Sequence, residues 1–209
     1  MSPRTKAQTS KLRAERKAQI LQAANSVFSR KGFHAANVSD VAAEAGVSQG
    51  TVYHYFDSKE ELFMAVFEAW ETGNLNREVL AAMDVSTSAS ERLRYLAYAV
   101  GEYMSKTEEF FPASVEFWSH IHRDAAIREG IRRIFVELNA TVAQLIQDGI
   151  DQGEFVSIDP QATAALLVAA YDGLILQWLA DPSSVDWRVI SETLTKLVFH
   201  GLLNPLQRT

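Results

Sequence analysis

Residues 37–62 read NVSDVAAEAGVSQGTVYHYFDSKEEL and decide the fold. Asn37 is a predicted N-cap residue, and the acidic Asp40 suits the positive end of the helix that follows. Gly46 tolerates the left-handed backbone conformation with which many helices end. Ser48 is a second predicted N-cap, and the Ser-Lys-Glu-Glu capping box near the end of the stretch starts a third helix. The stretch therefore predicts three short helices joined by two tight turns.

Two short helices joined by a glycine-containing turn form the helix-turn-helix, whose second helix enters the major groove of DNA. In the second predicted helix, Val52 and Phe56 are four residues apart and share one apolar face. The other side chains of this helix are hydrogen-bonding or aromatic rather than repeatedly acidic, which suits contacts to phosphates and base edges. A helical hairpin inside an unrelated helical bundle is the alternative interpretation.

The segment VSDVAAEAGVSQGTVYHYFDSKEELF resembles the DNA-binding signature of the tetracycline-repressor (TetR) family of bacterial transcription regulators, and the match runs from about Arg16 to Leu62. The rest of the chain is similar to the family in its length and helical layout, with a looser likeness in DQGEF (151–155) and AAYDGL (169–174). The resemblance implies an all-α fold. An N-terminal three-helix, helix-turn-helix DNA-binding head is joined by a linker helix to a C-terminal helical ligand-binding and dimerisation domain.

We therefore expect two domains. Residues 1–58 form an N-terminal arm and the helix-turn-helix DNA-binding domain, and residues 59–209 form the ligand-binding and dimerisation domain, which begins with a linker helix over about 59–73. Residues 1–12 are polar and without apolar periodicity, so a mobile arm is expected before a first helix over residues 13–30.

Apolar residues at helical spacing and capping signals predict the later helices. They cover about 88–105, 112–122, 124–151, 160–180 and 187–203. The last two are so rich in apolar residues that a monomer of this size would struggle to cover them. We expect both to pair with their twofold copies in a homodimer, as a four-helix bundle. A monomer core that covers both helices is the alternative.

The composition excludes several classes of protein. Among 209 residues there is no cysteine, which removes disulfides, thiolate metal sites and a cysteine nucleophile. The N-terminus does not resemble a signal peptide, and no run of apolar residues is long enough to predict a membrane span, so the expected location is cytoplasmic and no membrane partner is expected. The net charge of −6 divides into +4 over residues 1–60 and −10 over residues 61–209. The positive end therefore coincides with the helix-turn-helix, as expected of a protein that touches DNA with one end.

The resemblance implies roles for particular residues of the head. Residues at the front of the second helix should meet base edges or the nearest phosphates, the aromatic residues after them should hold the DNA backbone, and a residue of the preceding helix and a cation at the start of the linker helix should also reach DNA. Packing within the head is the alternative role for the tyrosines. The predicted DNA-binding residues are Ser39, Ser48, Gln49, Gly50, Thr51, Tyr53, His54, Tyr55 and Lys59.

Family resemblance also implies a small-molecule pocket among the helices of the second domain. Aromatic residues with a few polar groups are typical of such pockets. For any one of these aromatics, packing in the core is the alternative. Glu116 and His120, four residues apart, could bind a metal ion, or more simply form a hydrogen-bonded or solvent-facing pair; no metal or cofactor is expected. The predicted ligand-binding residues are Trp70, Tyr103, Phe111, Glu116, Phe117, His120, Phe135, Asn139, Tyr171 and Asp172.

The chain is thus expected to be a ligand-responsive, DNA-binding transcriptional regulator. A homodimeric repressor would bind a palindromic operator and be released by a small hydrophobic or aromatic inducer. An enzyme built on a helical bundle is one alternative, but the chain has no Glu-x-x-His pair and no glycine-rich phosphate loop, so no enzymatic activity is expected. A ligand-binding module that has lost DNA binding is the other alternative.

Overall fold

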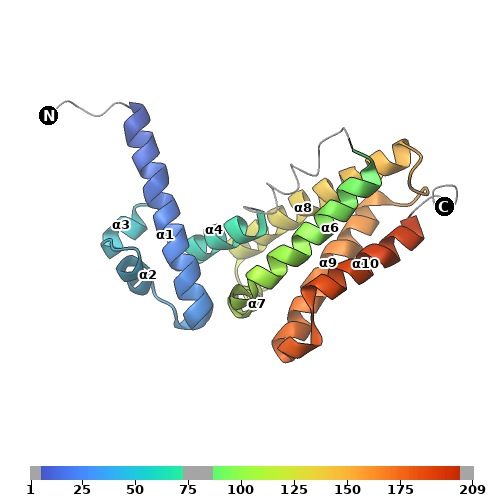
Figure 1. The fold of residues 1–209 in the computed structure, drawn as a ribbon. Helices are drawn as coiled ribbons and strands as arrows, with labels where there is room; N and C mark the ends of the chain where they lie inside the picture. The colour runs from blue at the N-terminus through green and yellow to red at the C-terminus, as the bar shows by residue number, and fades with distance from the viewer. Residues whose placement is uncertain (1–5, 73–86, 203–209) are drawn as a thin grey trace. The chain divides into compact units, whose positions relative to one another are not determined.

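The computed structural model describes residues 6–72 and 87–202, and this part of the chain consists of helices and connecting turns, with no β-strand (Figure 1). The chain divides into two compact units. The head unit comprises residues 1–70 and 109–128, and the body unit comprises residues 71–108 and 129–209. The expected domain boundary after residue 58 does not coincide with this division, because the linker helix and a later helix both pack with the head.

The helices of the head unit are α1 (Lys6–Ala35), α2 (Val38–Glu44), α3 (Gln49–Tyr53), α4 (Lys59–Thr72) and α7 (Phe111–Trp118), which follows a short 3-10 turn (Glu108–Phe110). Their shared core is strongly aromatic. The Phe63 ring lies 4.8 Å from Phe28, 5.1 Å from Phe33 and 4.3 Å from Phe117 between centroids. Helices α1, α4 and α7 are therefore joined by one cluster of phenylalanine rings.

Helix α1 differs from the expectation at its start. It begins at Lys6 rather than at Arg13, so the expectation of a mobile arm reaching residue 12 is wrong for residues 6–12. Described side chains of the first turns are exposed, so these turns need no apolar face, and residues such as Ala, Gln, Lys, Leu and Arg favour helix by themselves. At the other end the helix breaks at Gly32, whose φ of 74° and ψ of 172° are not helical.

The body unit contains α6 (Ala89–Lys106), most of α8 (Ala125–Asp151), α9 (Pro160–Ala180), a 3-10 turn (Pro182–Ser184) and α10 (Trp187–Leu202). Their starts follow the capping signals in the sequence. Ser88 Oγ accepts a hydrogen bond from the Glu91 N–H at 3.2 Å, and the Asp159 carboxylate accepts from the Gln161 N–H at 2.9 Å. Local sequence therefore sets where α6 and α9 begin.

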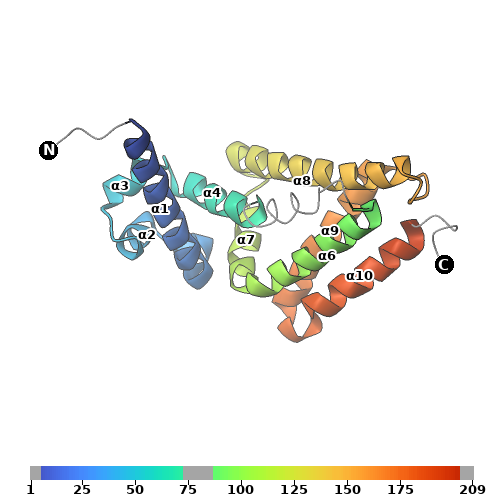
Figure 2. The ribbon, with the colours of Figure 1, turned by 45° about the horizontal axis from the view of Figure 1, so that its top comes forward.

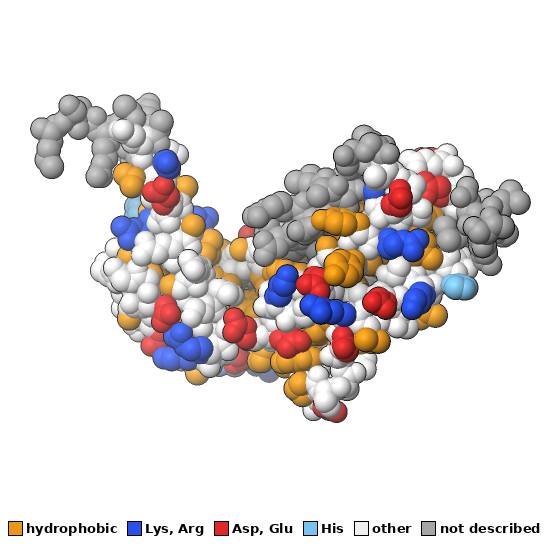
Figure 3. Space-filling view, viewed as in Figure 1, with side chains coloured by type: hydrophobic (Ala, Val, Ile, Leu, Met, Phe, Trp, Pro, Cys, Tyr) orange, Lys and Arg blue, Asp and Glu red, His pale blue; other side chains and the backbone are white. Residues whose placement is uncertain are grey.

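Helices α6 and α10 lie side by side (Figures 1 and 2). Gly101 on α6 permits this close approach, since a Cβ atom at that position would lie 2.1 Å from Ser191 Oγ. Phe199 of α10 and Leu93 and Leu96 of α6 enter one buried apolar cluster with Leu145 and other residues of α8. Figure 3 shows that, on the side of the body unit in view, hydrophobic side chains also reach the surface between charged ones.

Within one chain, α9 is poorly covered. Of its 21 residues only Ala164 and Ile175 are buried, and Leu166 is 72% exposed. By length and mean hydropathy alone α9 could cross a membrane, although polar residues such as Asp172 and Gln177 interrupt its apolar sequence. A single helix of this kind is weak evidence for a membrane protein, because helices that pack against other protein have the same composition.

Candidate DNA-binding surface and ligand cavity

Helix α3 presents the predicted recognition residues at the surface of the head unit. Ser48 is its N-cap and accepts from the Thr51 N–H at 3.2 Å, and the Ser48 and Thr51 hydroxyl groups lie 2.8 Å apart. Val52 is buried and anchors the helix, whereas Gln49 and Tyr53 are exposed. Of the nine predicted DNA-binding residues, the exposed ones are Ser39, Ser48, Gln49, Gly50, Tyr53 and His54, and the partly buried ones are Thr51, Tyr55 and Lys59.

Cations of α1 lie beside the end of α3. The Arg13 guanidinium is 5.9 Å from the centre of the Tyr55 ring, and the Lys17 ammonium is 5.5 Å from the centre of the Phe56 ring. Both cations are exposed. Their place near α3 depends on how α1 packs across the helix-turn-helix, so sequence reasoning did not include them among the predicted DNA-binding residues.

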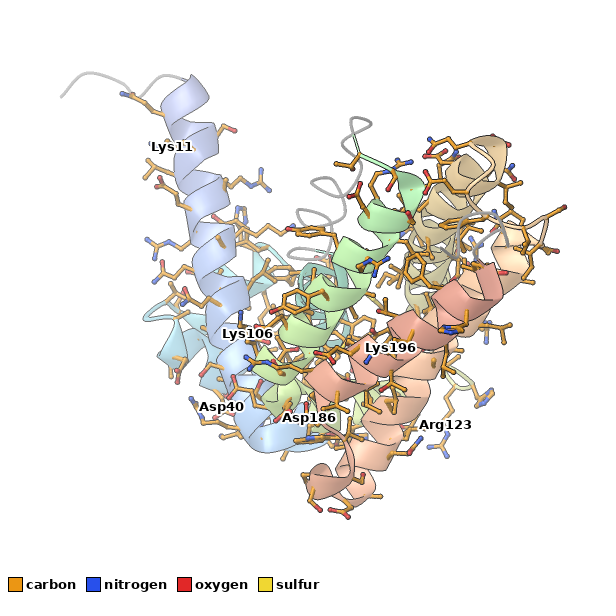
Figure 4. All side chains as sticks on the ribbon, turned by 45° about the vertical axis from the view of Figure 1, so that its right-hand side comes forward. Lys11, Asp40, Lys106, Arg123, Asp186 and Lys196 are labelled. Atoms are coloured by element: carbon orange, nitrogen blue, oxygen red, sulfur yellow. The ribbon has the colours of Figure 1, made fainter. Side chains whose placement is uncertain are left out.

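Two further cations of the head, Arg30 and Lys31, are paired with carboxylates within it. Arg30 Nη2 lies 3.0 Å from a carboxylate oxygen of Glu44, and Lys31 Nζ lies 2.8 Å from one of Asp40, which sits near the C-terminal end of α1 (Figure 4). Hydrogen bonds from these cations hold the pKa values of Glu44 and Asp40 below the usual range of carboxyl groups. The N-terminal half of α1 therefore supplies the exposed positive charge next to α3.

Lys59 and Glu116 both bind the backbone at the C-terminal end of α1, after its break at Gly32. The Lys59 ammonium donates to the carbonyl groups of Phe33 at 2.9 Å, His34 at 3.3 Å and Ala36 at 3.1 Å. The Glu116 carboxylate accepts from the N–H groups of Phe33 at 2.7 Å and His34 at 3.0 Å. All three ammonium donors of Lys59 are thereby used, so its predicted contact with a phosphate would have to compete with these bonds.

Four helices of the body unit line an apolar cavity of about 90 Å³ that is partly open to solvent. It is lined from α6 by Leu93, Leu96, Ala97, Val100 and Met104, from α8 by Leu138 and Val142, from α9 by Leu167, Val168, Tyr171 and Asp172, and from α10 by Leu194, Thr195, Val198 and Phe199. The Tyr171 hydroxyl lies 3.2 Å from Ser191 Oγ, and burial raises the pKa of this phenol. Burial also raises the pKa of the Asp172 carboxyl group, to about 6.

The structure does not assemble the predicted ligand-binding residues into one pocket. Of the ten predicted ligand-binding residues, only Tyr171 and Asp172 line the cavity. Tyr103, Phe135 and Asn139 belong to the body unit but lie outside this lining, and the head unit holds Trp70, Phe111, Glu116, Phe117 and His120. Those of the head have packing partners there: the Trp70 ring lies 6.1 Å from Phe111, and the Phe117 and His120 rings lie 5.1 and 5.4 Å from Phe33. The sequence analysis also missed the aliphatic lining, since leucines and valines of a cavity have the same spacing as those of a core.

Comparison with known proteins agrees with this architecture. Residues 20–66 match the family description "Bacterial regulatory proteins, tetR family", and residues 89–200 match "BetI-type transcriptional repressor, C-terminal". The chain is 33% identical over 176 residues, 84% of each protein, to YfiR of Bacillus subtilis (strain 168), which is named an uncharacterized HTH-type transcriptional regulator.

Solved structures of regulators share the fold. The regulator FadR from Bacillus subtilis, in complex with stearoyl-CoA, superposes with a TM-score of 0.76 at 22% identity and covers 88% of this chain and 98% of its own. A regulator from Saccharomonospora viridis, in complex with choline, superposes with a TM-score of 0.77 at 23% identity and covers 91% of this chain and 99% of its own. The recognition helix is exposed, and the family descriptions match both the N-terminal and the C-terminal part of the chain. The chain therefore belongs to the tetR family of bacterial regulatory proteins, which are DNA-binding transcriptional regulators and not enzymes.

Proposed function

We propose that this regulator is a cytoplasmic homodimeric repressor that binds a palindromic operator and is released when a small, mainly apolar ligand enters the cavity of the body unit. The observation that carries the DNA-binding half is the exposed surface of α3, with Gln49 and Tyr53 outward and Val52 inward. The cations Arg13 and Lys17 beside it would neutralise phosphates on either side of the groove.

Replacing Gln49 and Tyr53 together by alanine should weaken operator binding by roughly 100-fold at physiological salt. One side chain would lose its hydrogen bonds to a base edge and the other its contact with the DNA backbone, each worth about 1–3 kcal/mol. Fluorescence anisotropy with palindromic DNA from the region flanking the gene measures this affinity. A Gln161→Ala/Tyr98→Ala variant, which changes exposed residues of the same types in the body unit, should bind like the wild type. Equal affinity of the two double variants would contradict the proposed recognition surface.

Dimerisation is proposed to use α9 and α10. Leu166 on α9 is 72% exposed and Leu197 on α10 is 67% exposed in the isolated chain, and such side chains gain most from burial by a second copy. A symmetric dimer would also carry two recognition helices, as a palindromic operator requires.

Introducing glutamate at Leu166 and Leu197 should convert the dimer to a monomer and, through loss of the second head, abolish operator binding. Burying two carboxylates per chain in an apolar interface costs several kcal/mol, whereas the same changes on a free surface cost less than about 0.5 kcal/mol. Sedimentation equilibrium gives the mass directly. The matched control is Val136→Glu on α8, an exposed position outside the proposed interface, which should leave the mass unchanged. A dimer that survives the double change would place the interface elsewhere.

Ligand release is proposed to work through the cavity. Leu138 and Val142 of α8 line it, and the first residues of the same helix, up to Arg128, belong to the head unit. A ligand that fits one arrangement of α6, α8, α9 and α10 better than another would favour that arrangement. A shift of α8 would also move its first residues, which belong to the head unit. The ligands in the two similar structures, stearoyl-CoA and choline, differ in chemistry, so the ligand class of this cavity has to be inferred from its own residues.

A further inference from the structure

The cavity of the body unit combines an apolar lining with one unpaired carboxylate. Among the described residues that line it, Asp172 is the only charged side chain; the remaining polar groups are the hydroxyls of Tyr171 and Thr195. In the part of the chain that the structure describes, the Asp172 carboxylate makes no hydrogen bond or ion pair, and burial alone perturbs it. An unpaired carboxylate in apolar surroundings is costly unless a cation or a hydrogen-bond donor reaches it.

The lining of the cavity extends along α6. On this helix it runs from Leu93 to Met104, which corresponds to about 16 Å along the helix axis. An extended apolar lining of this kind suits a hydrocarbon chain that lies along the helix. Leucine, valine and methionine side chains along the walls offer such a chain apolar contact throughout.

We propose that the ligand of this cavity is a linear alkyl cation, whose hydrocarbon chain lies along α6 and whose ammonium group pairs with the Asp172 carboxylate. The inference rests on the proposed function, since it names the ligand class of the same cavity. The carboxylate supplies the selectivity, because a chain with a neutral head leaves Asp172 without a partner and a chain with a carboxylate head places two like charges together.

Calorimetric titration of the full-length dimer with octylammonium, 1-octanol and octanoate at pH 7.5 tests the proposal, because the three probes share one chain and differ only in the head. The wild type should bind octylammonium at least about tenfold more tightly than 1-octanol, and octanoate least. Asp172→Asn should bind octylammonium at least about tenfold more weakly and 1-octanol about as before. Asp172→Glu should keep the preference for the cation. The control Glu192→Gln, at an exposed position on α10, should leave all three affinities unchanged.

Several results would overturn the proposal. Octanoate or 1-octanol binding as tightly as octylammonium would do so, as would an Asp172→Asn variant with unchanged cation affinity; in both cases the cavity would remain a ligand site of another class. If Asp172→Asn changed the oligomeric state but not the affinity for octylammonium, the carboxylate would be neutralised by a second copy of the chain rather than by a ligand. If none of the three probes binds, the ligand-site part of the proposed function fails together with this inference, whereas the operator-binding test of α3 is unaffected.

Discussion

Replacing Lys59 by methionine is expected to destabilise the head unit by about 3 kcal/mol and to abolish operator binding. Methionine has nearly the same length as lysine but donates no hydrogen bond, so the carbonyl groups of Phe33, His34 and Ala36 lose their shared donor. Hydrogen bonds to charged groups contribute about 1.5–3 kcal/mol each when intact. Because this site is partly exposed, water replaces some of the lost bonds, and we expect a total of about 3 kcal/mol rather than the roughly 4.5 kcal/mol of three bonds at the lower end of that range. Of the side-chain hydrogen bonds described for this segment, those that Glu116 accepts from the N–H groups of Phe33 and His34 would remain.

Urea unfolding followed by circular dichroism, at one fixed protein concentration, measures the loss of stability. Lys31→Met is the matched control, because Lys31 also belongs to the head but pairs with Asp40 at the surface, where an ion pair contributes less than about 1 kcal/mol. Lys59→Arg keeps the charge, but its planar guanidinium fits three converging carbonyls poorly, so we expect it to recover only part of the stability. If Lys59→Met were as stable as Lys31→Met and lost only DNA affinity, Lys59 would act mainly on a phosphate.

The second large effect is expected from Asp172, as a change in how stability depends on pH. Its folded-state pKa of about 6 lies above the ordinary value of 3.8, so the folded chain binds this proton more tightly than the unfolded chain. The contribution of Asp172 to the free energy of unfolding is therefore most favourable below about pH 4 and falls as the pH rises from about 4 to about 6. No other acidic or basic side chain among the described lining residues from α6, α8, α9 and α10 titrates in that range.

Asp172→Asn removes this ionisation. We therefore expect the free energy of unfolding of the variant, minus that of the wild type, to rise by about 2 kcal/mol from pH 4 to pH 7.5. The full pKa difference corresponds to roughly 3 kcal/mol, and water entering the cavity reduces it. Urea unfolding of both proteins at pH 4, 5, 6 and 7.5 gives the difference, and other groups that titrate cancel from it. Glu192→Gln on the surface of α10 should show no such trend. A difference that stays constant across this range would mean that Asp172 has an ordinary pKa.

The helix starts show what could be predicted from the sequence. The sequence predicted Asn37, Ser48 and the capping box that starts at Ser58 as helix starts, and a helix begins directly after each of these three residues. Capping is a local interaction between a side chain and backbone groups two or three residues away, so it can be read from the sequence. The helix-turn-helix follows from the same local signals together with the apolar spacing of Val52 and Phe56, both buried.

Contacts between residues far apart in the chain could not be predicted in the same way. Glu116 was predicted as a ligand-binding residue, yet it binds backbone groups 82 and 83 residues earlier. The aromatic residues of α7 were predicted to line the same pocket, but they fill the core of the head, because a phenylalanine has the same periodicity in either place.

By itself, the amino-acid sequence determined most of the helices, the starts that carry a capping residue and the recognition helix, because caps, turns and apolar periodicity act over a few residues. The family followed from the resemblance of the helix-turn-helix stretch. Only the tertiary structure decided that Lys59 and Glu116 bind the backbone at the C-terminal end of α1, and that Asp172 lies unpaired in an apolar cavity. The physical reason is that the partners of a charged side chain, or its lack of partners, depend on which distant helices pack around it.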